Sequence, residues 1–183
     1  MDNLEQIAQE VKNCQLCSLS QSRTKTVPGD GAEKADLMFI GEGPGKEEDK
    51  QGLPFVGSAG KFLEELLGTI NLTKQDVFIG NIVKCRPPLN RDPFPKEIEA
   101  CLPYLERQIK VIKPKLIITL GRHAMYQFLP DNLKISQVHG KPFRRHDQVY
   151  LPLYHPAAAL YHGSLREIII KDFKKIPLIL KKI

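Results

Sequence analysis

Short apolar runs, separated by segments whose apolar residues recur three and four positions apart, organise this chain. The runs lie at residues 37–40, 77–79 with a possible extension to 83, 116–120 and 148–153. Apolar runs of this length are typical of strands that are covered on both faces of a parallel sheet. In the segments between these runs, apolar residues recur three and four positions apart, which is typical of amphipathic helices. Alternating strands and helices predict a three-layer α/β/α sandwich around a mostly parallel, four-stranded sheet.

Three of the predicted helices contain residues with specific local effects. The first helix is expected to begin at Asn3, whose side chain can serve as its N-cap. Pro103 lies inside the helix predicted over residues 98–112 and should kink or break it. Ser164 and Glu167 form a capping-box pattern at the start of the last predicted helix.

The stretch after the first predicted strand is rich in groups that could serve chemistry. The turn at residues 41–45, GEGPG, lets the backbone approach a ligand closely and expose N–H groups. It is neither a Walker A loop nor a dinucleotide-binding motif, because Lys46 occupies the position of a required glycine. Phe55 follows in a loop where its ring can face a flat ligand. Four carboxylates in this stretch disfavour phosphate binding: Glu42, Glu47, Glu48 and Asp49. The glycines alone are equally consistent with a simple turn.

Each predicted strand ends at a glycine or polar residue. These ends are Gly41-Glu42, Gly80-Asn81, Gly121-Arg122 and Tyr154-His155-Pro156. In open α/β sheets, ligands bind at the carboxyl ends of the strands. A single Asn or His would more often be a capping or surface residue. Their shared placement predicts one pocket formed by four strand ends.

Composition indicates a single globular domain, residues 1–183, with 42% hydrophobic and 26% charged residues. The formal net charge of +6 favours an anionic partner such as nucleic acid, although the basic residues are scattered and could simply be solvated. The first residues do not resemble a secretory signal, and no apolar run is long enough to span a membrane. We therefore expect a cytoplasmic, nucleoid-associated protein with no membrane partner.

Four cysteines form a C-x₂-C pair followed by two single residues: Cys14, Cys17, Cys85 and Cys101. An intracellular protein seldom keeps structural disulfides, so a metal site is favoured. Sets of four thiolates hold zinc or an iron–sulfur cluster. The absence of a second C-x₂-C unit, which a zinc ribbon would have, favours the cluster. Buried cysteines without a metal are the remaining alternative.

Several motifs occur in a characteristic order along the chain. They are Gly41-Glu42-Gly43-Pro44-Gly45-x-x-Glu48-Asp49, Pro54-Phe55-Val56-Gly57, Gly80-Asn81-x-x-Lys84-Cys85-Arg86-Pro87-Pro88, His155-Pro156-Ala157-Ala158 and the four cysteines. This ordered set resembles the family-4 uracil-DNA glycosylases, which contain a 4Fe-4S cluster. The match extends from Cys14 to about Arg166.

The resemblance implies that the protein flips deoxyuridine out of single- or double-stranded DNA and hydrolyses its N-glycosidic bond. The products would be an abasic site and free uracil. By similarity, Phe55 would stack on the uracil face, and Asn81 would pair with N3–H and O4. His155 would be catalytic, with a hydrogen bond to O2 that strengthens as the base departs.

The same resemblance leaves the position of the attacking water open. Gly41, Glu42 and Gly43 would line the pocket and help hold the water, and Glu47 is close enough in sequence to contribute. Better-known glycosylases of the superfamily position the water with an aspartate where this chain has Gly43, and exclude thymine with an aromatic residue where it has Gly45. We therefore expect Glu42 or Glu47 to position the water.

Other implications concern the cofactor and the way DNA is held. The resemblance implies a 4Fe-4S cluster on Cys14, Cys17, Cys85 and Cys101, and we expect a monomer. The residue that fills the gap left by the flipped base would lie just after His155-Pro156, where Leu160 or Tyr161 could serve. Alternative functions are a glycosylase for other deaminated bases and a non-catalytic, iron–sulfur DNA-binding module.

Overall fold

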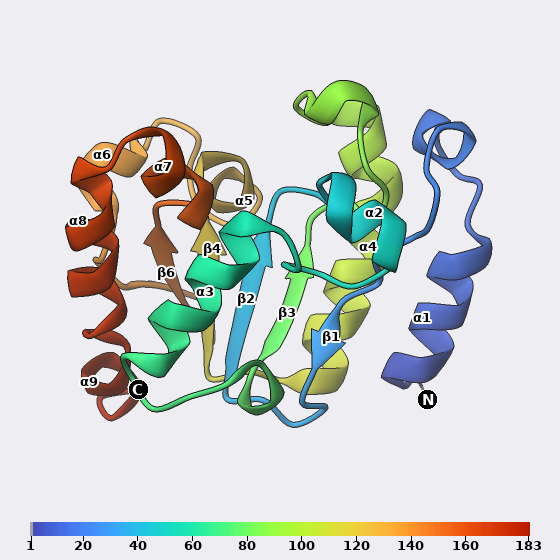
Figure 1. Cartoon of the computed structure of the whole chain (residues 1–183). Helices are drawn as coiled ribbons and strands as arrows, with labels where there is room; N and C mark the ends of the chain where they lie inside the picture. Colours follow the sequence, from blue (N-terminus) through green and yellow to red (C-terminus); the bar gives the residue numbers. More distant parts are fainter. Residues whose placement is uncertain (1) are drawn as a thin grey trace.

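The computed structural model describes residues 2–183 and contains a central mixed sheet covered by helices on both faces (Figure 1). The four strands predicted from the sequence are β2 (Leu37–Gly41), β3 (Phe78–Asn81), β4 (Leu116–Leu120) and β6 (Gln148–Leu153). They are mutually parallel and adjacent in the order β3-β2-β4-β6. The predicted α/β/α sandwich is therefore confirmed.

Two short antiparallel strands extend this sheet to six strands, two more than the sequence predicted. β1 (Asp30–Gly31) pairs with β3, and β5 (Phe143–Arg145) pairs with β6. Their two or three residues are mostly exposed and include no apolar run, so hydrophobic patterning could not reveal them. Gly31 is required in β1, since a Cβ there would lie 1.9 Å from the Val77 carbonyl oxygen.

Nine described α-helices pack around the sheet. They are α1 (Leu4–Asn13), α2 (Lys46–Gln51), α3 (Ser58–Gly68), α4 (Pro95–Ile112), α5 (Arg122–Tyr126), α6 (Ile135–Val138), α7 (Pro156–Tyr161), α8 (Ser164–Phe173) and α9 (Ile176–Leu180). Alternate residues of β2 point to opposite faces, where they meet different helices. Phe39 packs in the core beside α3 and α8, whereas Met38 and Ile40 pack in the core beside α4. Both faces of β2, at the centre of the sheet, are therefore buried.

The structure confirms one of the local helix predictions, corrects another, and excludes a break at Pro103. Asn3 does cap α1, because its Oδ1 accepts a hydrogen bond from the Gln6 N–H at 2.7 Å. Pro103 does not break α4, which is continuous through it. Pro103 lies on the exposed side of the helix, where water can solvate the carbonyl that loses its partner. Ser164 is the first residue of α8 rather than its cap, and no side chain caps that helix.

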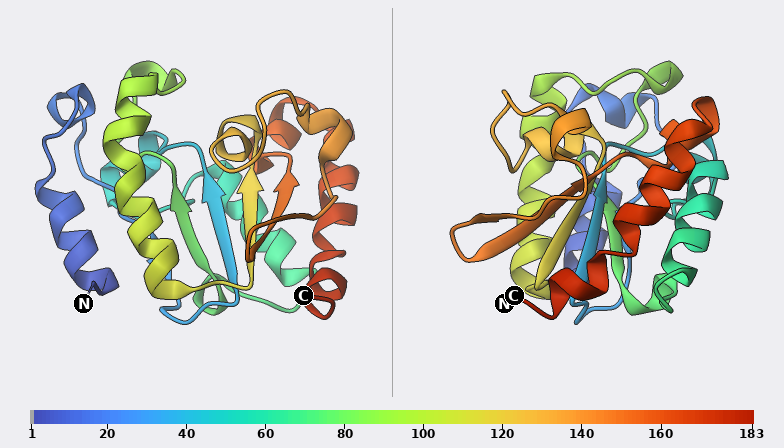
Figure 2. Two further views of the ribbon diagram at one scale, coloured as in Figure 1. Left: turned by 180° about the vertical axis from the view of Figure 1, so that it is seen from behind. Right: turned by 90° about the vertical axis from the view of Figure 1, so that its left-hand side faces the viewer.

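All four parallel strands point toward the same end of the molecule, where their following turns gather (Figures 1 and 2). Both chain ends lie at the opposite end. None of the helices within residues 2–183 has the length and apolar character needed to cross a membrane. The fold thus collects the polar residues that end the strands at one edge of the sheet.

Candidate active site

A cavity of about 310 Å³ opens at the carboxyl ends of the parallel strands. Its lining comes from the turn after β2, the Phe55 loop, the end of β3, the loop that leads into α4 and the start of α7. The residues are Glu42, Gly43, Pro44, Gly45, Glu48, Phe55, Ala59, Asn81, Pro87, Asn90, Arg91, His155 and Ala157. Three of the four predicted strand ends therefore contribute to one pocket. The fourth end lies behind it, because a Cβ on Gly121 would be 3.3 Å from the His155 Cβ.

Phe55 forms one wall of the cavity and is held in an unusual backbone conformation. Its φ of 51° lies in the left-handed region, which is rare for a bulky residue and marks local strain. The backbone around it is fixed from both sides: Glu48 Oε1 accepts the N–H groups of Val56 and Gly57, each at 2.9 Å. Lys74 Nζ donates to the Phe55 carbonyl at 2.9 Å. The ring is thereby fixed against the cavity, 5.5 Å from the His155 ring at an interplanar angle of 26°.

Asn81 brings an unpaired hydrogen-bond donor to the cavity. Its side chain is only 1% exposed, and its Nδ2 has no partner among the described residues. An unpaired buried donor costs about 1–3 kcal/mol, so this amide is suited to a ligand that can accept a hydrogen bond. Gly41 leaves the space that the amide occupies, since a Cβ there would lie 2.4 Å from Asn81 Oδ1 and 3.0 Å from the Phe55 ring. Because Gly41 has no side chain, it leaves room for the Asn81 amide and the Phe55 ring, which both line the cavity.

His155 is the N-cap of α7, and this role determines which ring nitrogen carries the proton. Its Nδ1 accepts the Ala157 N–H at 3.1 Å, so the neutral ring carries its proton on Nε2. Removal from water lowers the pKa of His155 to about 4, and the nearby Glu48 charge opposes that shift. At neutral pH the imidazole is therefore uncharged and can donate from Nε2.

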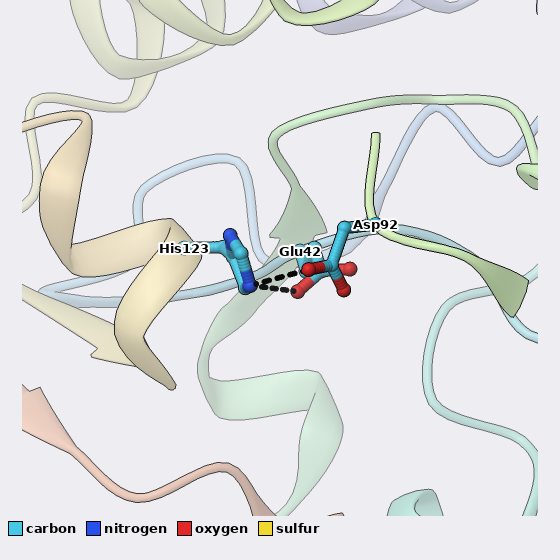
Figure 3. Close-up of side chains that lie close together, drawn as sticks. All are labelled: Glu42, Asp92 and His123. Atoms are coloured by element: carbon cyan, nitrogen blue, oxygen red, sulfur yellow. Dashed lines mark ion pairs between the residues drawn. The ribbon is translucent and has the colours of Figure 1, made fainter. Parts of the chain in front are cut away.

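Glu42 lies at the edge of the cavity beside a histidine and a second carboxylate (Figure 3). Its Oε2 is 3.7 Å from His123 Nε2, which is 3.2 Å from Asp92 Oδ2. Burial raises the pKa of Glu42, and the neighbouring His123 partly offsets the increase. One oxygen or nitrogen from each of the three residues lies within 4.8 Å of the others, a spacing that could also admit a cation. Asp92 is largely exposed and lies 3.7 Å from Arg122 Nη2, while Arg122 Nε donates a hydrogen bond to His123 Nε2 at 3.0 Å.

The four cysteines line a second cavity, between α1, the turn after it, the segment after β3 and α4. Cys14 and Cys17 are partly exposed, whereas Cys85 and Cys101 are buried. Two N–H groups point at the buried sulfurs: Arg23 Nη1 is 3.2 Å from Cys85 Sγ, and the Lys84 backbone N–H is 3.2 Å from Cys101 Sγ. Within residues 2–183, no three of these sulfurs lie within 4.8 Å of one another. The site is thus a cavity lined by four cysteines, in which the Arg23 guanidinium and the Lys84 backbone N–H donate hydrogen bonds to the two buried sulfurs.

Comparison with known proteins agrees with this geometry. A family model described as the uracil DNA glycosylase superfamily matches residues 28–176. The type-4 uracil-DNA glycosylase of Saccharolobus solfataricus is 52% identical over 96% of this chain and 86% of that protein. The corresponding proteins of Sulfurisphaera tokodaii and Archaeoglobus fulgidus are 51% and 47% identical, over 84% and 92% of their lengths. The chain belongs to the type-4 group of the uracil-DNA glycosylase superfamily.

In this type-4 glycosylase, the structure shows which of two neighbouring carboxylates faces the cavity. The sequence alone did not indicate this. Glu48 lines the cavity, while the exposed Glu47 carboxylate pairs with Lys50 at 3.0 Å. A Cβ on Gly45 would lie 2.7 Å from Glu48 Oε2, so Glu48 occupies the space left by that glycine. Successive residues of a helix point about 100° apart, which is why only one of the two can face the cavity.

Four residues in or beside the cavity were not predicted from the sequence: three precede α4, and one lies in α5. Asn90 and Arg91 line the cavity, and Asp92 and His123 surround Glu42. None of them follows a predicted strand directly except His123, which comes two residues after Gly121 in the fourth strand-end turn. Because His123 follows the carboxyl end of β4, its position in the sequence could have identified it as a candidate site residue.

Proposed function

We propose that this type-4 glycosylase binds a deoxyuridine flipped out of DNA in the cavity at the strand ends and hydrolyses its N-glycosidic bond. The observation that supports this most strongly is the convergence of Phe55, His155 and the unpaired Asn81 amide in one cavity of about 310 Å³. A planar base with adjacent donor and acceptor groups suits these three side chains. The products would be free uracil and an abasic site in single- or double-stranded DNA.

Phe55 and Asn81 would recognise the base. Stacking on an aromatic ring is worth about 1–3 kcal/mol per base and does not distinguish one base from another. Asn81 would supply the discrimination, with Nδ2 donating to O4 and Oδ1 accepting from N3–H. Cytosine offers an acceptor at N3 and a donor at position 4, so both contacts would be mismatched in a buried site, where unpaired polar groups are costly.

His155 would stabilise the departing base. Its Nε2–H would donate to uracil O2, where negative charge develops as the glycosidic bond breaks. The contact strengthens toward the transition state and therefore accelerates the chemical step. A neutral imidazole can make this bond without first losing a proton, and the lowered pKa of about 4 favours that form.

Glu42 is the carboxylate that we expect to position the attacking water. It lines the cavity, whereas Glu47 is engaged with Lys50 on the exposed face of α2. Burial raises the pKa of Glu42, but His123, at 3.7 Å, favours the charged form that can orient a water. Gly41 and Gly43 would keep the turn close enough to the base for this water to reach C1′.

The four cysteines would hold a 4Fe-4S cluster that links α1, the segment after β3 and α4. The N–H groups of Arg23 and Lys84, each 3.2 Å from a buried sulfur, support a negatively charged group at this site. Bound there, the cluster would act as a structural cross-link.

All proposed site residues come from one chain, so we expect the protein to act as a monomer on cellular DNA in the nucleoid. The proposed function is tested by incubating the protein with oligonucleotides that contain uracil, hypoxanthine, xanthine or no lesion. We expect release of uracil from both single- and double-stranded substrates. Preferential release of another base would indicate a different lesion, and DNA binding without base release would indicate a non-catalytic module.

A further inference from the structure

A buried lysine connects the cysteine cavity with the cavity at the strand ends. Lys84 lines the cysteine cavity and is only 1% exposed. Its Nζ donates a hydrogen bond to the backbone carbonyl of Asn81, whose side chain lines the other cavity. A buried lysine is costly unless its donors are hydrogen-bonded, so the groups that its amine contacts indicate what it does.

The contact with Asn81 replaces a strand that is missing beside the end of β3. The short edge strand β1 pairs only with Phe78 and Ile79, and therefore stops before Asn81. Lys84 folds back over three residues, and its Nζ lies 3.0 Å from the Asn81 carbonyl oxygen. The amine thus supplies a donor to this carbonyl at a point where the sheet has ended.

The position of the Asn81 side chain depends on this backbone contact. Its Nδ2 has no hydrogen-bond partner among residues 2–183, so the amide donor is not held by the protein before a base binds. On the side of β2, the next residue is fixed, because the Ile82 N–H donates to the Gly41 carbonyl at 3.0 Å. On the other side, Lys84 provides the corresponding contact.

The Lys84 amine is itself held in place by two other parts of the chain. Gln108, which lies on α4 and is 2% exposed, accepts a second hydrogen bond from Nζ at 2.7 Å. The Gln108 Nε2 in turn donates to the Pro28 carbonyl at 2.8 Å. The Lys84 carbonyl accepts the Val27 N–H at 2.7 Å. Such a supporting shell holds a recognition group precisely.

We propose that Lys84 is a positioning residue for uracil recognition: its Nζ holds the Asn81 backbone so that the side-chain amide meets the base. This inference rests on the proposed function and deepens it. Lys84 does not line the strand-end cavity, so it acts through Asn81 and not on the base. Because its backbone N–H also donates to Cys101 Sγ at 3.2 Å, this one residue joins the cysteine site to the recognition residue.

A purely structural role for Lys84 is the competing explanation, since its hydrogen bonds also join β3, α4 and the loop before β1. The two roles differ in what they require. A structural lysine would affect activity whether or not Asn81 is present. A positioning lysine has an effect only while the Asn81 amide is there to be positioned, so the two substitutions should not be additive.

The test is a double-mutant cycle on single-turnover uracil release from a single-stranded oligonucleotide. Lys84→Met removes the amine but keeps a side chain of similar length, and it should lower the rate by at least about tenfold. In an Asn81→Ala background, the same substitution should lower the rate by less than about twofold. Equal fold-losses in the two backgrounds, or a wild-type rate for Lys84→Met, would overturn the proposal.

Lys141→Met is the matched control for this cycle. Lys141 is an exposed lysine outside both cavities, and its Nζ likewise donates to a backbone carbonyl, that of Gln137, at 2.8 Å. Its substitution should leave the rate unchanged. A wild-type protein that releases no uracil would contradict the proposed function itself, a result distinct from additive losses in the cycle.

A binding measurement tests the same idea without turnover. The probes are oligonucleotides with 2′-fluorodeoxyuridine or 2′-fluorodeoxycytidine, whose glycosidic bonds resist cleavage. The wild type should bind the uracil probe more tightly, and Lys84→Met should lose at least about fivefold of this preference. Weaker binding of both probes with an unchanged preference would indicate a structural role and would overturn the proposal.

A second variant decides the question if Lys84→Met does not fold. Gln108→Met leaves the lysine in place but removes the side chain that holds its amine. It should lower the rate of uracil release by about threefold or more, and have no further effect in the Asn81→Ala background. Both variants should keep the wild-type iron content, because the N–H beside Cys101 belongs to the backbone. Loss of iron, or a wild-type rate for Gln108→Met, would overturn the proposal.

Discussion

Asn81 combines in one residue the two properties that define a binding site: burial and an unused hydrogen-bond donor. Its position was predictable because it ends a strand, but the empty space around it depends on Gly41, which comes 40 positions earlier. His155 similarly acts through its surroundings, since the Ala157 N–H selects its tautomer. At the scale of single residues, the properties of Asn81 and His155 therefore depend on neighbouring groups that come close to them only in the folded chain.

Gly41→Ala should impair activity without unfolding the protein. The new Cβ would collide with Asn81 Oδ1 and the Phe55 ring, so both base contacts would shift. A displacement of this kind near a reacting centre can cost about 10²-fold, measured as the single-turnover rate of uracil release. Gly68→Ala is the control, because a Cβ there meets nothing within 4 Å. Equal rates for Gly41→Ala and wild type would show that the close packing is unimportant.

His155 should make the folded protein less stable in mild acid. Its folded pKa of about 4 lies below the ordinary value of 6.5, so between those pH values the unfolded chain binds a proton that the folded chain does not. The free energy of unfolding should therefore decrease as pH falls from about 6.5 to about 4. Urea denaturation at several pH values, with His155→Gln for comparison, checks this. The variant should lose less stability over that range, and an identical pH dependence would contradict the assignment.

At the scale of elements, the sequence predicted the strands that have a clear apolar pattern and missed the strands of only two or three residues. Mostly apolar runs identified β2, β3, β4 and β6, because strands that are covered by helices in a parallel sheet need such residues. The edge strands β1 and β5 have too few residues to show a pattern. The loop before α4 gave no periodic signal either, yet it contributes Asn90 and Arg91 to the cavity.

This loop should depend on Glu97 for its conformation. Glu97 is buried, and its hydrogen bonds with Arg91 contribute most to lowering its pKa to about 2. Glu97→Ala removes the acceptor of hydrogen bonds from Arg91, Ser18 Oγ and the Phe94 N–H, and should reduce the free energy of unfolding by about 2 kcal/mol, the usual contribution of hydrogen bonds to a charged group. Glu65→Ala, which removes an exposed partner of Arg166, should cost at most about 1 kcal/mol. Similar losses in thermal or urea denaturation for the two variants would show that the buried pair is not an anchor.

At the scale of the whole molecule, the sheet assembles the site from distant parts of the chain. Parallel strands β2, β3 and β6 carry Glu42, Asn81 and His155 to one edge, although these residues span more than half of the sequence. The strand-end rule predicted that convergence. It could not predict which side chain of the Glu47-Glu48 pair faces inward, because that depends on how α2 packs.

The cysteine cavity adds a prediction about the whole molecule. Protein purified without oxygen should be brown, with broad visible absorbance and about four irons per chain. Cys101→Ser should lose colour and iron, because it removes one of the four sulfurs. Colourless protein with stoichiometric zinc would contradict the iron–sulfur assignment.

The central claim is that Phe55, Asn81 and His155 act together on one flipped uracil. The most direct test is single-turnover release of uracil from a single-stranded oligonucleotide by wild type, Asn81→Ala and His155→Ala. We predict rapid release by the wild type and a decrease of about 10²- to 10³-fold for His155→Ala, the usual effect of removing one donor to a developing negative charge. Asn81→Ala should also be strongly impaired. Wild-type rates in both variants would contradict the account.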